Sequence, residues 1–192
     1  MREVKPSILI GCSAGESKGG NRLLFSEEVC KEMAALNRRP VIFALSTPEP
    51  DVLPQNVYRW TEGRAIYSGR EQWSPVRVAR LREGLLKPRA CQSAYVFPGV
   101  VLGCLAAGAV RVHPEMFLAA AETIAEHVTE EDLESGAVYP CMSRAKEFSA
   151  HVAKAVAEVA YVKGTATNLP KPVNMLDFIR GVMYDTRYRP YR

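Results

Sequence analysis

The stretch Ser7-Ile8-Leu9-Ile10-Gly11 decides the fold that the sequence predicts. It is a short apolar run that ends in glycine, a pattern typical of a β-strand buried on both faces. A second run of the same kind, Pro40-Val41-Ile42-Phe43-Ala44-Leu45, follows after a helix-forming segment. Strand, helix and strand in this length indicate a βαβ unit with parallel strands and a right-handed crossover.

The helix between these strands is predicted from its end signals. Ser26 is suited to the N-cap position, and Glu27 and Glu28 in the first turn suit the helix dipole. Asn37 is expected to end the helix in a left-handed conformation.

Two more segments extend the pattern toward an open sheet. Residues 55–60 predict a short helix, and residues 64–69 predict a third strand. Parallel strands release their following loops at one edge of the sheet, and open α/β sheets bind ligands there. The small, polar, glycine-rich loop at residues 11–20 could turn backbone N–H groups toward a cofactor, although an ordinary connecting loop has the same composition.

A basic segment at residues 70–89 interrupts this pattern with six basic and two acidic side chains. Trp73 lies near its start, so charge and stacking could together bind nucleic acid. A solvated loop explains the segment equally well, and the modest net charge of +4 gives nucleic-acid binding little support.

The remaining sequence predicts helices. Pro98 at the first helical position, Pro114 and the N-cap Ser143 mark three helix starts, and Gly164 ends the last of these helices. Residues 175–183 predict one further short helix. The predicted fold class is therefore α/β, with a partial Rossmann-like parallel sheet of about three to four strands and flanking helices, followed by a C-terminal helical region.

Composition limits the classes of function. The chain has 192 residues, 47% apolar and 24% charged, which suits a globular domain. Its five scattered cysteines form no CxxC pair, so we expect reduced thiols in an intracellular compartment, cytoplasmic or mitochondrial. No run is long enough for a secretion signal or a membrane span. His127 and His151 are expected on polar helix faces, and no histidines share a metal-binding spacing, so no metal site is predicted.

Several segments, in order and with preserved spacing, resemble the C-terminal part of malic enzymes. The most distinctive is Tyr95-Val96-Phe97-Pro98-Gly99-Val100-Val101-Leu102-Gly103. The other matching segments are Lys5-Pro6-Ser7-Ile8-Leu9-Ile10-Gly11, Phe25-Ser26-Glu27-Glu28-Val29, Met33-Ala34-Ala35-Leu36-Asn37, Arg39-Pro40-Val41-Ile42-Phe43-Ala44-Leu45-Ser46, Thr61-Glu62-Gly63-Arg64-Ala65, Gly136-Ala137-Val138-Tyr139-Pro140 and Ala160-Tyr161.

The resemblance implies that residues 1–166 are the C-terminal portion of an NAD(P)-binding Rossmann domain with its closing helices. Residues 167–192 would form an extended or helical tail. Malic enzymes oxidise malate with NAD or NADP and decarboxylate the product, using Mg²⁺ or Mn²⁺. The family's general acid, general base, metal ligands and dinucleotide fingerprint are expected upstream of this chain, and no G-x-G-x-x-G occurs in it. No catalytic or metal-binding residue is therefore assigned here.

Binding residues carry over from the family position by position. The cofactor-binding candidates are Gly11, Cys12, Ser13, Ala14, Ser46, Thr47 and Ser93. The substrate-binding candidates are Thr47, Gln92 and Ser93. Thr47 replaces the asparagine of the family's Ser-Asn-Pro turn, and Gln92 and Ser93 replace paired asparagines, so these positions form either a pocket or the relic of one.

Three hypotheses about function stay open. The chain is a segment of a malic-enzyme-like oxidoreductase that is inactive alone, or a degenerate Rossmann-type binding or regulatory module without catalysis, or, less favoured, a nucleic-acid binder that uses its basic loop. The expected partners are a dinucleotide and malate, with a homo-oligomer or the family's N-terminal portion as a further partner. An unpaired apolar strand edge is expected if this chain folds alone.

Overall fold

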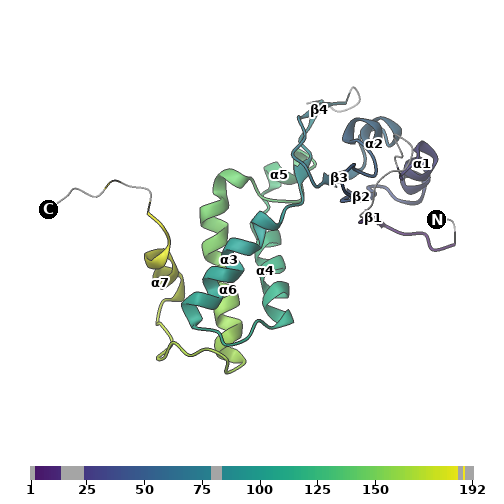
Figure 1. The fold of residues 1–192 in the computed structure, drawn as a ribbon. Coiled ribbons are helices and arrows are strands. Elements are labelled where there is room, and N and C mark those ends of the chain that lie inside the picture. Colours follow the sequence, from purple (N-terminus) through teal and green to yellow (C-terminus); the bar gives the residue numbers. More distant parts are fainter. Residues whose placement is uncertain (1–2, 14–23, 79–83, 186–187, 189–192) are drawn as a thin grey trace. The chain divides into compact units, whose positions relative to one another are not determined.

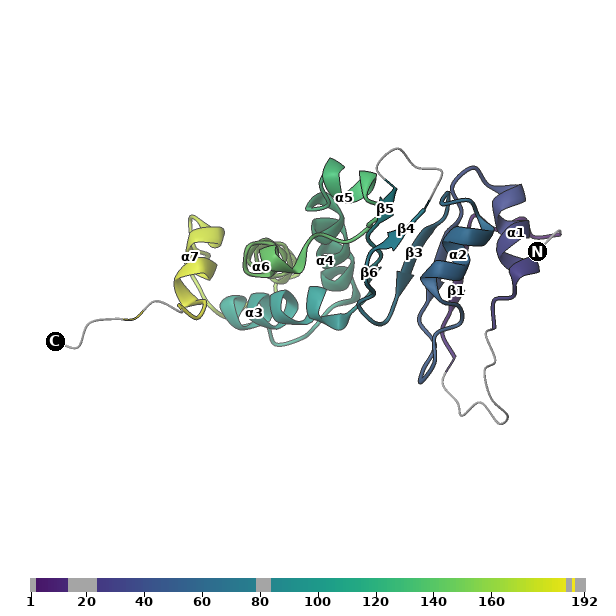
Figure 2. The ribbon, with the colours of Figure 1, turned by 90° about the horizontal axis from the view of Figure 1, so that it is seen from above.

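The computed structural model describes residues 3–13, 24–78, 84–185 and 188 of the chain. The described chain forms two compact units, which the ribbon views in Figures 1 and 2 show. The first unit comprises residues 1–92 and 128–140, and the second comprises residues 93–127 and 141–192. The predicted boundary between residues 1–166 and the tail at residues 167–192 is a different division from these two units, and it stays a prediction.

The first unit is built on a parallel sheet of four strands in the order β1-β2-β3-β6. Its register places Ile8 beside Val41 and Val41 beside Ile66. The predicted strand–helix–strand pattern is thereby confirmed. The elements are β1 (Ile8–Gly11), α1 (Glu27–Leu36), β2 (Val41–Ala44), α2 (Pro54–Trp60), β3 (Ile66–Gly69) and β6 (Arg89–Ala90).

Helix α1 begins where its N-terminal signals predict. The Ser26 hydroxyl accepts a hydrogen bond from the Val29 N–H at 3.4 Å, which satisfies one of the free donors of the first turn. The expected left-handed stop at Asn37 is wrong, because this residue is extended with φ −132°. Its side-chain amide instead donates to the carbonyls of Met33 and Pro6, so a side chain ends this helix.

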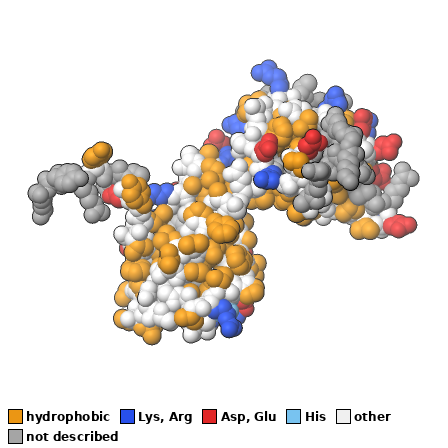
Figure 3. Space-filling model, in the orientation of Figure 1, with side chains coloured by type: hydrophobic (Ala, Val, Ile, Leu, Met, Phe, Trp, Pro, Cys, Tyr) orange, Lys and Arg blue, Asp and Glu red, His pale blue; other side chains and the backbone are white. Residues whose placement is uncertain are grey.

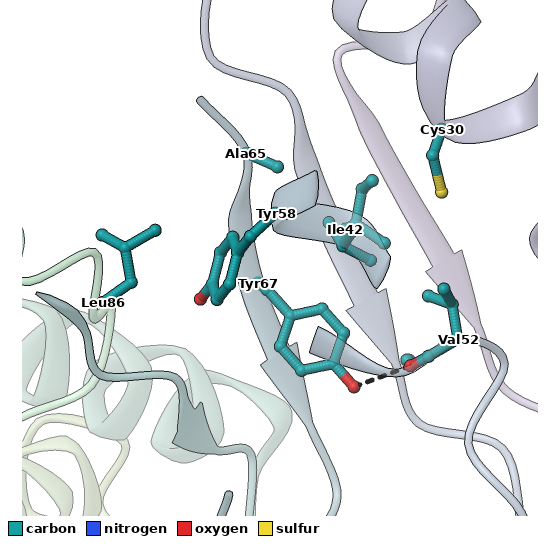
Figure 4. Packing of buried hydrophobic residues seen from close by; sticks show 9 residues of the cluster. Cys30, Ile42, Val52, Tyr58, Ala65, Tyr67 and Leu86 are labelled. Carbon is teal, nitrogen blue, oxygen red and sulfur yellow. Dashed lines mark hydrogen bonds between the residues drawn. The ribbon is translucent and has the colours of Figure 1, made fainter. Parts of the chain in front are cut away.

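The core of the first unit lies on one face of the sheet, between the strands and helices α1 and α2. Ile42 and Tyr67 point from β2 and β3 toward Cys30 of α1 and Tyr58 of α2, and all four are buried (Figure 4). The Tyr67 hydroxyl donates to the Val52 carbonyl at 2.9 Å. This bond satisfies the polar end of an otherwise apolar contact.

The other face of the sheet is less covered. Ile8 and Ile10 are 53% and 57% exposed, so the prediction that this strand is buried on both faces is wrong. Both core helices pack against the opposite face, and β1 is an edge strand of the described sheet. The expected apolar edge is therefore present.

The basic segment contains secondary structure that the sequence did not indicate. Strands β4 (Val76–Arg77) and β5 (Leu85–Leu86) pair in an antiparallel ribbon, while Arg80 and Arg82 lie outside the described residues. The following strand, β6, joins the main sheet. Its Arg89 forms an ion pair at 2.6 Å with Asp132 of α5 (Glu130–Glu134).

The second unit is helical. Its helices are α3 (Phe97–Ala107), α4 (Pro114–Glu126), α6 (Ala145–Val162) and α7 (Met175–Val182). Ser143 is not the N-cap of α6, because it lies inside a 3₁₀ turn, Met142–Arg144, that precedes the helix. Helices α3 and α6 pack closely, since a Cβ at Gly103 would lie 2.5 Å from the Ala153 carbonyl oxygen.

Helix α3 is apolar on all sides and carries no charge, yet one side is open to solvent. Phe97, Val101 and Leu105 are 66%, 48% and 70% exposed, and Figure 3 shows hydrophobic side chains gathered over the helical unit. None of the helices in the described parts of the chain is long and apolar enough to cross a membrane.

Candidate functional site at the carboxyl edge of the sheet

The loops that follow β1 and β2 run side by side beyond the end of the sheet. The Leu45 N–H donates to the Gly11 carbonyl at 2.9 Å, and the Thr47 N–H donates to the Ser13 carbonyl at 3.0 Å. These bonds continue the parallel pairing of the strands by two residues on each side. The first residues of both loops are therefore held in fixed positions at the carboxyl edge.

A chain of hydrogen bonds ties these loops to a buried carboxylate. The Ser13 N–H and the Ser13 hydroxyl both donate to Ser46 Oγ, at 2.9 and 3.0 Å. Ser46 in turn donates its hydroxyl to Asp51 Oδ1 at 2.6 Å and its N–H to Asp51 Oδ2 at 3.2 Å. Asp51 is 1% exposed and Ser46 is 6% exposed, while Ser13 is open to solvent.

Gly11 is required in this arrangement because the Asp51 carboxylate lies against its backbone. A Cβ built on Gly11 would lie 2.2 Å from both Cγ and Oδ2 of Asp51. Asp51 is the residue at this edge that sequence reasoning missed. Its only sequence signal is a short acidic residue in the turn that follows a strand.

The structure brings most of the predicted loop residues together. Gly11 is the last residue of β1, Cys12 and Ser13 follow it, and Ser46 and Thr47 follow β2 at the same corner of the first unit, with Cys12 exposed and Thr47 half-buried. Ala14 lies outside the described residues.

The other two predicted residues fall on either side of the division between the units. Gln92 is exposed and follows β6, so it also leaves the sheet at its carboxyl edge. Ser93 is exposed and opens the second unit, in a 3₁₀ turn (Ser93–Tyr95) ahead of α3.

The residue between β6 and Gln92 is held by two contacts within the first unit. The Cys91 N–H donates to the Gly69 carbonyl at 2.7 Å, and the Tyr139 hydroxyl donates to Cys91 Sγ at 3.1 Å. Tyr139 also packs its ring 6.5 Å from that of Phe43 on β2. The end of β6 is thereby fixed against its neighbours in the sheet.

The described residues contain no group of three or more His, Cys, Asp or Glu side chains that could hold a metal ion. The sequence predicts His127 and His151 on polar helix faces, and in the structure the centroids of their two rings lie 4.8 Å from each other. Burial, and then the charge of His127, lower the pKa of His151. This pair lies in the second unit and includes no predicted site residue.

A second feature of the helical unit is an open apolar pocket of about 500 Å³ beside the start of α3. Ala94, Pro98 and Leu102 line it together with residues that follow α7, and Lys146 supplies one charged group. None of the predicted binding residues lines this pocket.

The open parallel sheet, with loops that gather polar groups at its carboxyl edge, defines a Rossmann-like α/β protein. Residues 1–161 match the family model described as "Malic enzyme, NAD binding domain". The chain belongs to the malic enzyme family.

Relatives similar in sequence agree with this family. The chain is 39% identical over 194 residues to an NADP-dependent malic enzyme of Vitis vinifera, and 37% identical over 195 residues to a chloroplastic one of Flaveria pringlei. All of this chain is matched in both, but only 31% and 29% of those relatives. The chain therefore spans less than a third of their length.

Two solved malic enzymes share the fold. The structure from Entamoeba histolytica aligns with a TM-score of 0.67 at 21% identity, over 93% of this chain and 32% of that one. The structure from Pyrococcus horikoshii aligns with a TM-score of 0.61 at 22% identity, over 91% of this chain and 34% of that one. The predicted fold class is confirmed.

Proposed function

We propose that this chain supplies part of the dinucleotide- and substrate-binding edge of a malic-enzyme-type oxidoreductase and does not catalyse by itself. The reaction of the complete enzyme would be the oxidative decarboxylation of malate to pyruvate with NAD(P). The observation that carries the proposal is the corner at which Ser13, Ser46 and Thr47 are held by backbone and side-chain bonds. A corner fixed in this way orders ligand-facing groups before a ligand arrives.

The residues at this corner fit the neutral part of a dinucleotide. Ser13 presents an exposed hydroxyl beside Thr47, in the position where open α/β sheets receive their ligands. Two relatives are named NADP-dependent, which favours NADP over NAD as the cofactor. Gly11 and Cys12 contribute backbone to the same corner, and Ser93 stays a cofactor-binding candidate by resemblance.

Substrate contacts in this proposal come from Thr47, Gln92 and Ser93. Malate carries two carboxylates, and charge-assisted hydrogen bonds to such groups are worth about 1.5–3 kcal/mol each. Chemistry at the malate hydroxyl needs an acid, a base and a Lewis acid, which the rest of a malic-enzyme polypeptide or a partner chain would supply. No group of residues in the described ranges fits a divalent metal, so no metal step is assigned to them.

The substitutions at Thr47 and Gln92 favour one alternative, a degenerate binding or regulatory module without catalysis. Thr47 and Gln92 differ from the asparagines expected by resemblance, while the supporting bonds from Ser13 to Asp51 are complete. A degenerate binding or regulatory module would have these properties. A third candidate, nucleic-acid binding through the basic segment, loses one cation because Arg89 is paired with Asp132.

The intracellular location is part of the same proposal. The five cysteines all lie within the described residues and form no disulfide there, and reduced thiols are typical of an intracellular compartment.

A cofactor titration tests the proposal. We expect NADP⁺ or NAD⁺ to shift the backbone amide resonances of Ser46 and Thr47 saturably in the isotope-labelled chain, and Thr47→Asn to strengthen binding. Ser143→Ala, an exposed serine in the second unit, is the matched control. Saturable binding without turnover would support the segment of an oxidoreductase, whereas unchanged resonances with either dinucleotide would contradict a retained binding edge.

A further inference from the structure

We propose that Asp51 fixes the direction of a hydrogen-bond relay that runs from Ser13 through Ser46, so that Ser13 Oγ faces a ligand only as an acceptor. Ser13 Oγ would then select a neutral hydrogen-bond donor, a sugar hydroxyl or a carboxamide NH₂, over an anionic oxygen, while Thr47 stays available for the substrate. The inference deepens the proposed function and rests on it, in that a ligand approaches this edge of the sheet.

The direction follows from counting protons. A carboxylate only accepts, and Asp51 accepts both the N–H and the O–H of Ser46. The O–H···O distance of 2.6 Å is in the range of a bond to an ionised acceptor. The single hydroxyl proton of Ser46 is therefore committed to Asp51, and Ser46 Oγ can only accept from Ser13.

Ser13 then has no proton left for a ligand. Its hydroxyl proton points to Ser46 Oγ at 3.0 Å, and its N–H points to the same oxygen at 2.9 Å. These two bonds use both lone pairs of Ser46. What Ser13 Oγ offers to solvent is its own lone pairs, which suit a donor.

Three backbone donors in the described part of the corner are also used internally. The N–H of Ser13 is bound to Ser46, that of Ser46 to Asp51, and that of Thr47 to the Ser13 carbonyl. Anion sites in βα loops depend on backbone N–H groups that point outward. These three point inward, so none of them is available to an anion that approaches Ser13.

Burial makes the relay a fixed feature of the fold. Asp51 and Ser46 are 1% and 6% exposed, so water has little access to their bonds, while Ser13 is exposed. The direction of hydrogen-bond donation is thus fixed by buried residues, and it determines what Ser13 can accept at the surface. Asp51 acts as a positioning residue because its effect on a ligand passes through Ser46 and Ser13.

The isosteric change Asp51→Asn should reverse the relay. An asparagine has one acceptor and one NH₂ donor. With its oxygen on the Ser46 N–H, its NH₂ would donate to Ser46 Oγ, and the Ser46 hydroxyl could then donate to Ser13. The Ser13 proton becomes free for a ligand, so the corner gains the ability to bind an anionic oxygen.

The test follows the amide resonance of Ser13 in the isotope-labelled full chain during titration with ribose, nicotinamide and inorganic phosphate. In the wild-type chain we expect a saturable shift with ribose or nicotinamide and none with phosphate. The two neutral probes distinguish a sugar hydroxyl from a carboxamide. In Asp51→Asn, binding of the neutral probe should weaken by about two- to tenfold, the range of one neutral hydrogen bond, and phosphate should now shift the resonance.

Ser13→Ala tests the same inference at an exposed position that need not affect folding, and it should weaken the neutral probe by a similar factor. Its matched control, Ser143→Ala, should leave binding unchanged. The inference is overturned if the wild-type corner responds to phosphate alone or to none of the probes, or if Ser13→Ala binds the neutral probe as the wild type does. Loss of dinucleotide binding with an intact ribose or nicotinamide response would count against the proposed function and leave the relay standing.

Discussion

Gly11 and Asp51 fit together so closely that a Cβ on Gly11 would lie 2.2 Å from the Asp51 carboxylate. This contact joins the last residue of β1 to the turn that follows β2. It explains why the first predicted strand ends in glycine: the residue leaves space for a carboxylate, and its backbone φ is not in the left-handed region. The same carboxylate supports Ser46, so a packing requirement and the candidate site depend on one residue.

Gly11→Ala should destabilise the first unit by about 1–3 kcal/mol, the usual cost of overpacking. The cost arises from contact with Asp51, so it should be much smaller when Gly11→Ala is made in an Asp51→Ala background. Urea unfolding followed by tryptophan fluorescence measures it, because Trp60 and Trp73 both lie in the first unit. If Gly11→Ala lowers the free energy of unfolding equally in the wild type and in Asp51→Ala, contact with Asp51 is not the cause of the loss.

Gly103→Ala should destabilise the second unit, because the added Cβ would lie 2.5 Å from the backbone oxygen of Ala153 and α3 would have to move away from α6. A loss of about 1–3 kcal/mol is expected. Thermal unfolding followed by circular dichroism reports on these helices. The matched control is Gly181→Ala in α7, where nothing lies within 4 Å of the new Cβ, and it should be neutral or slightly stabilising.

Arg89→Met should destabilise the first unit by about 3–5 kcal/mol at most, since it removes the guanidinium that pairs at 2.6 Å with the largely buried Asp132 carboxylate. Asp132 would keep the bond that its Oδ2 accepts from the Thr129 N–H. Adding Asp132→Asn removes the carboxylate charge that Arg89 balanced and should recover part of the loss. Fluorescence-detected urea unfolding of the two single variants and the double variant measures the coupling between Arg89 and Asp132. If the losses in the free energy of unfolding of the single variants simply add in the double variant, the two residues are not coupled.

Alkaline pH should weaken the first unit through Cys30. Burial raises the pKa of this thiol from 9.0 to about 11. Between about pH 9 and pH 11 the unfolded chain therefore loses a proton that the folded chain keeps, so stability falls as pH rises. Tyr58 and Tyr67 act in the same direction because burial also raises the pKa of each phenol.

Urea unfolding across this pH range measures the effect, and Cys30→Ala should show a shallower decline than the wild type. In the native chain, a thiol reagent should modify the exposed Cys12 before Cys30. An unchanged slope in Cys30→Ala would contradict this assignment.

The edge strand should promote self-association. Ile8 and Ile10 expose apolar side chains on β1, an edge of the described sheet, and unpaired edges pair readily with other chains. Ile10→Lys should reduce association with little effect on stability. Sedimentation velocity over a concentration series measures this, with Val173→Lys, a fully exposed position in the second unit, as control. If Ile10→Lys and Val173→Lys self-associate equally, a surface other than the β1 edge is responsible for the association.

The regular part of the first unit could be predicted because its signals are local. Apolar runs with end signals mark β1, β2 and α1, and parallel order then places the loops after Gly11 and Leu45 at one edge. Strand β6 is only Arg89–Ala90, too short and too charged to show a period. Ile8 and Ile10 fit a buried strand by pattern, but burial depends on what covers the sheet.

Contacts between distant segments could not be predicted. Asp51 resembles any acidic turn residue until the fold brings it against Gly11 and Ser46, which are 40 and 5 positions away in the sequence. His127 and His151 likewise come together only through helix packing. The candidate loops were therefore identified from the sequence, while the carboxylate that orients them required the structure.

The central claim is that this chain retains a binding edge of the malic enzyme family without catalysing the reaction alone. A turnover assay of the purified chain with malate, Mn²⁺ and either NADP⁺ or NAD⁺, followed by the absorbance of reduced cofactor, tests it most directly. We predict no formation of reduced cofactor above the protein-free blank, in a sample whose cofactor titration shows saturable binding. Turnover that rises in proportion to chain concentration, and that Ser46→Ala diminishes, would contradict the account.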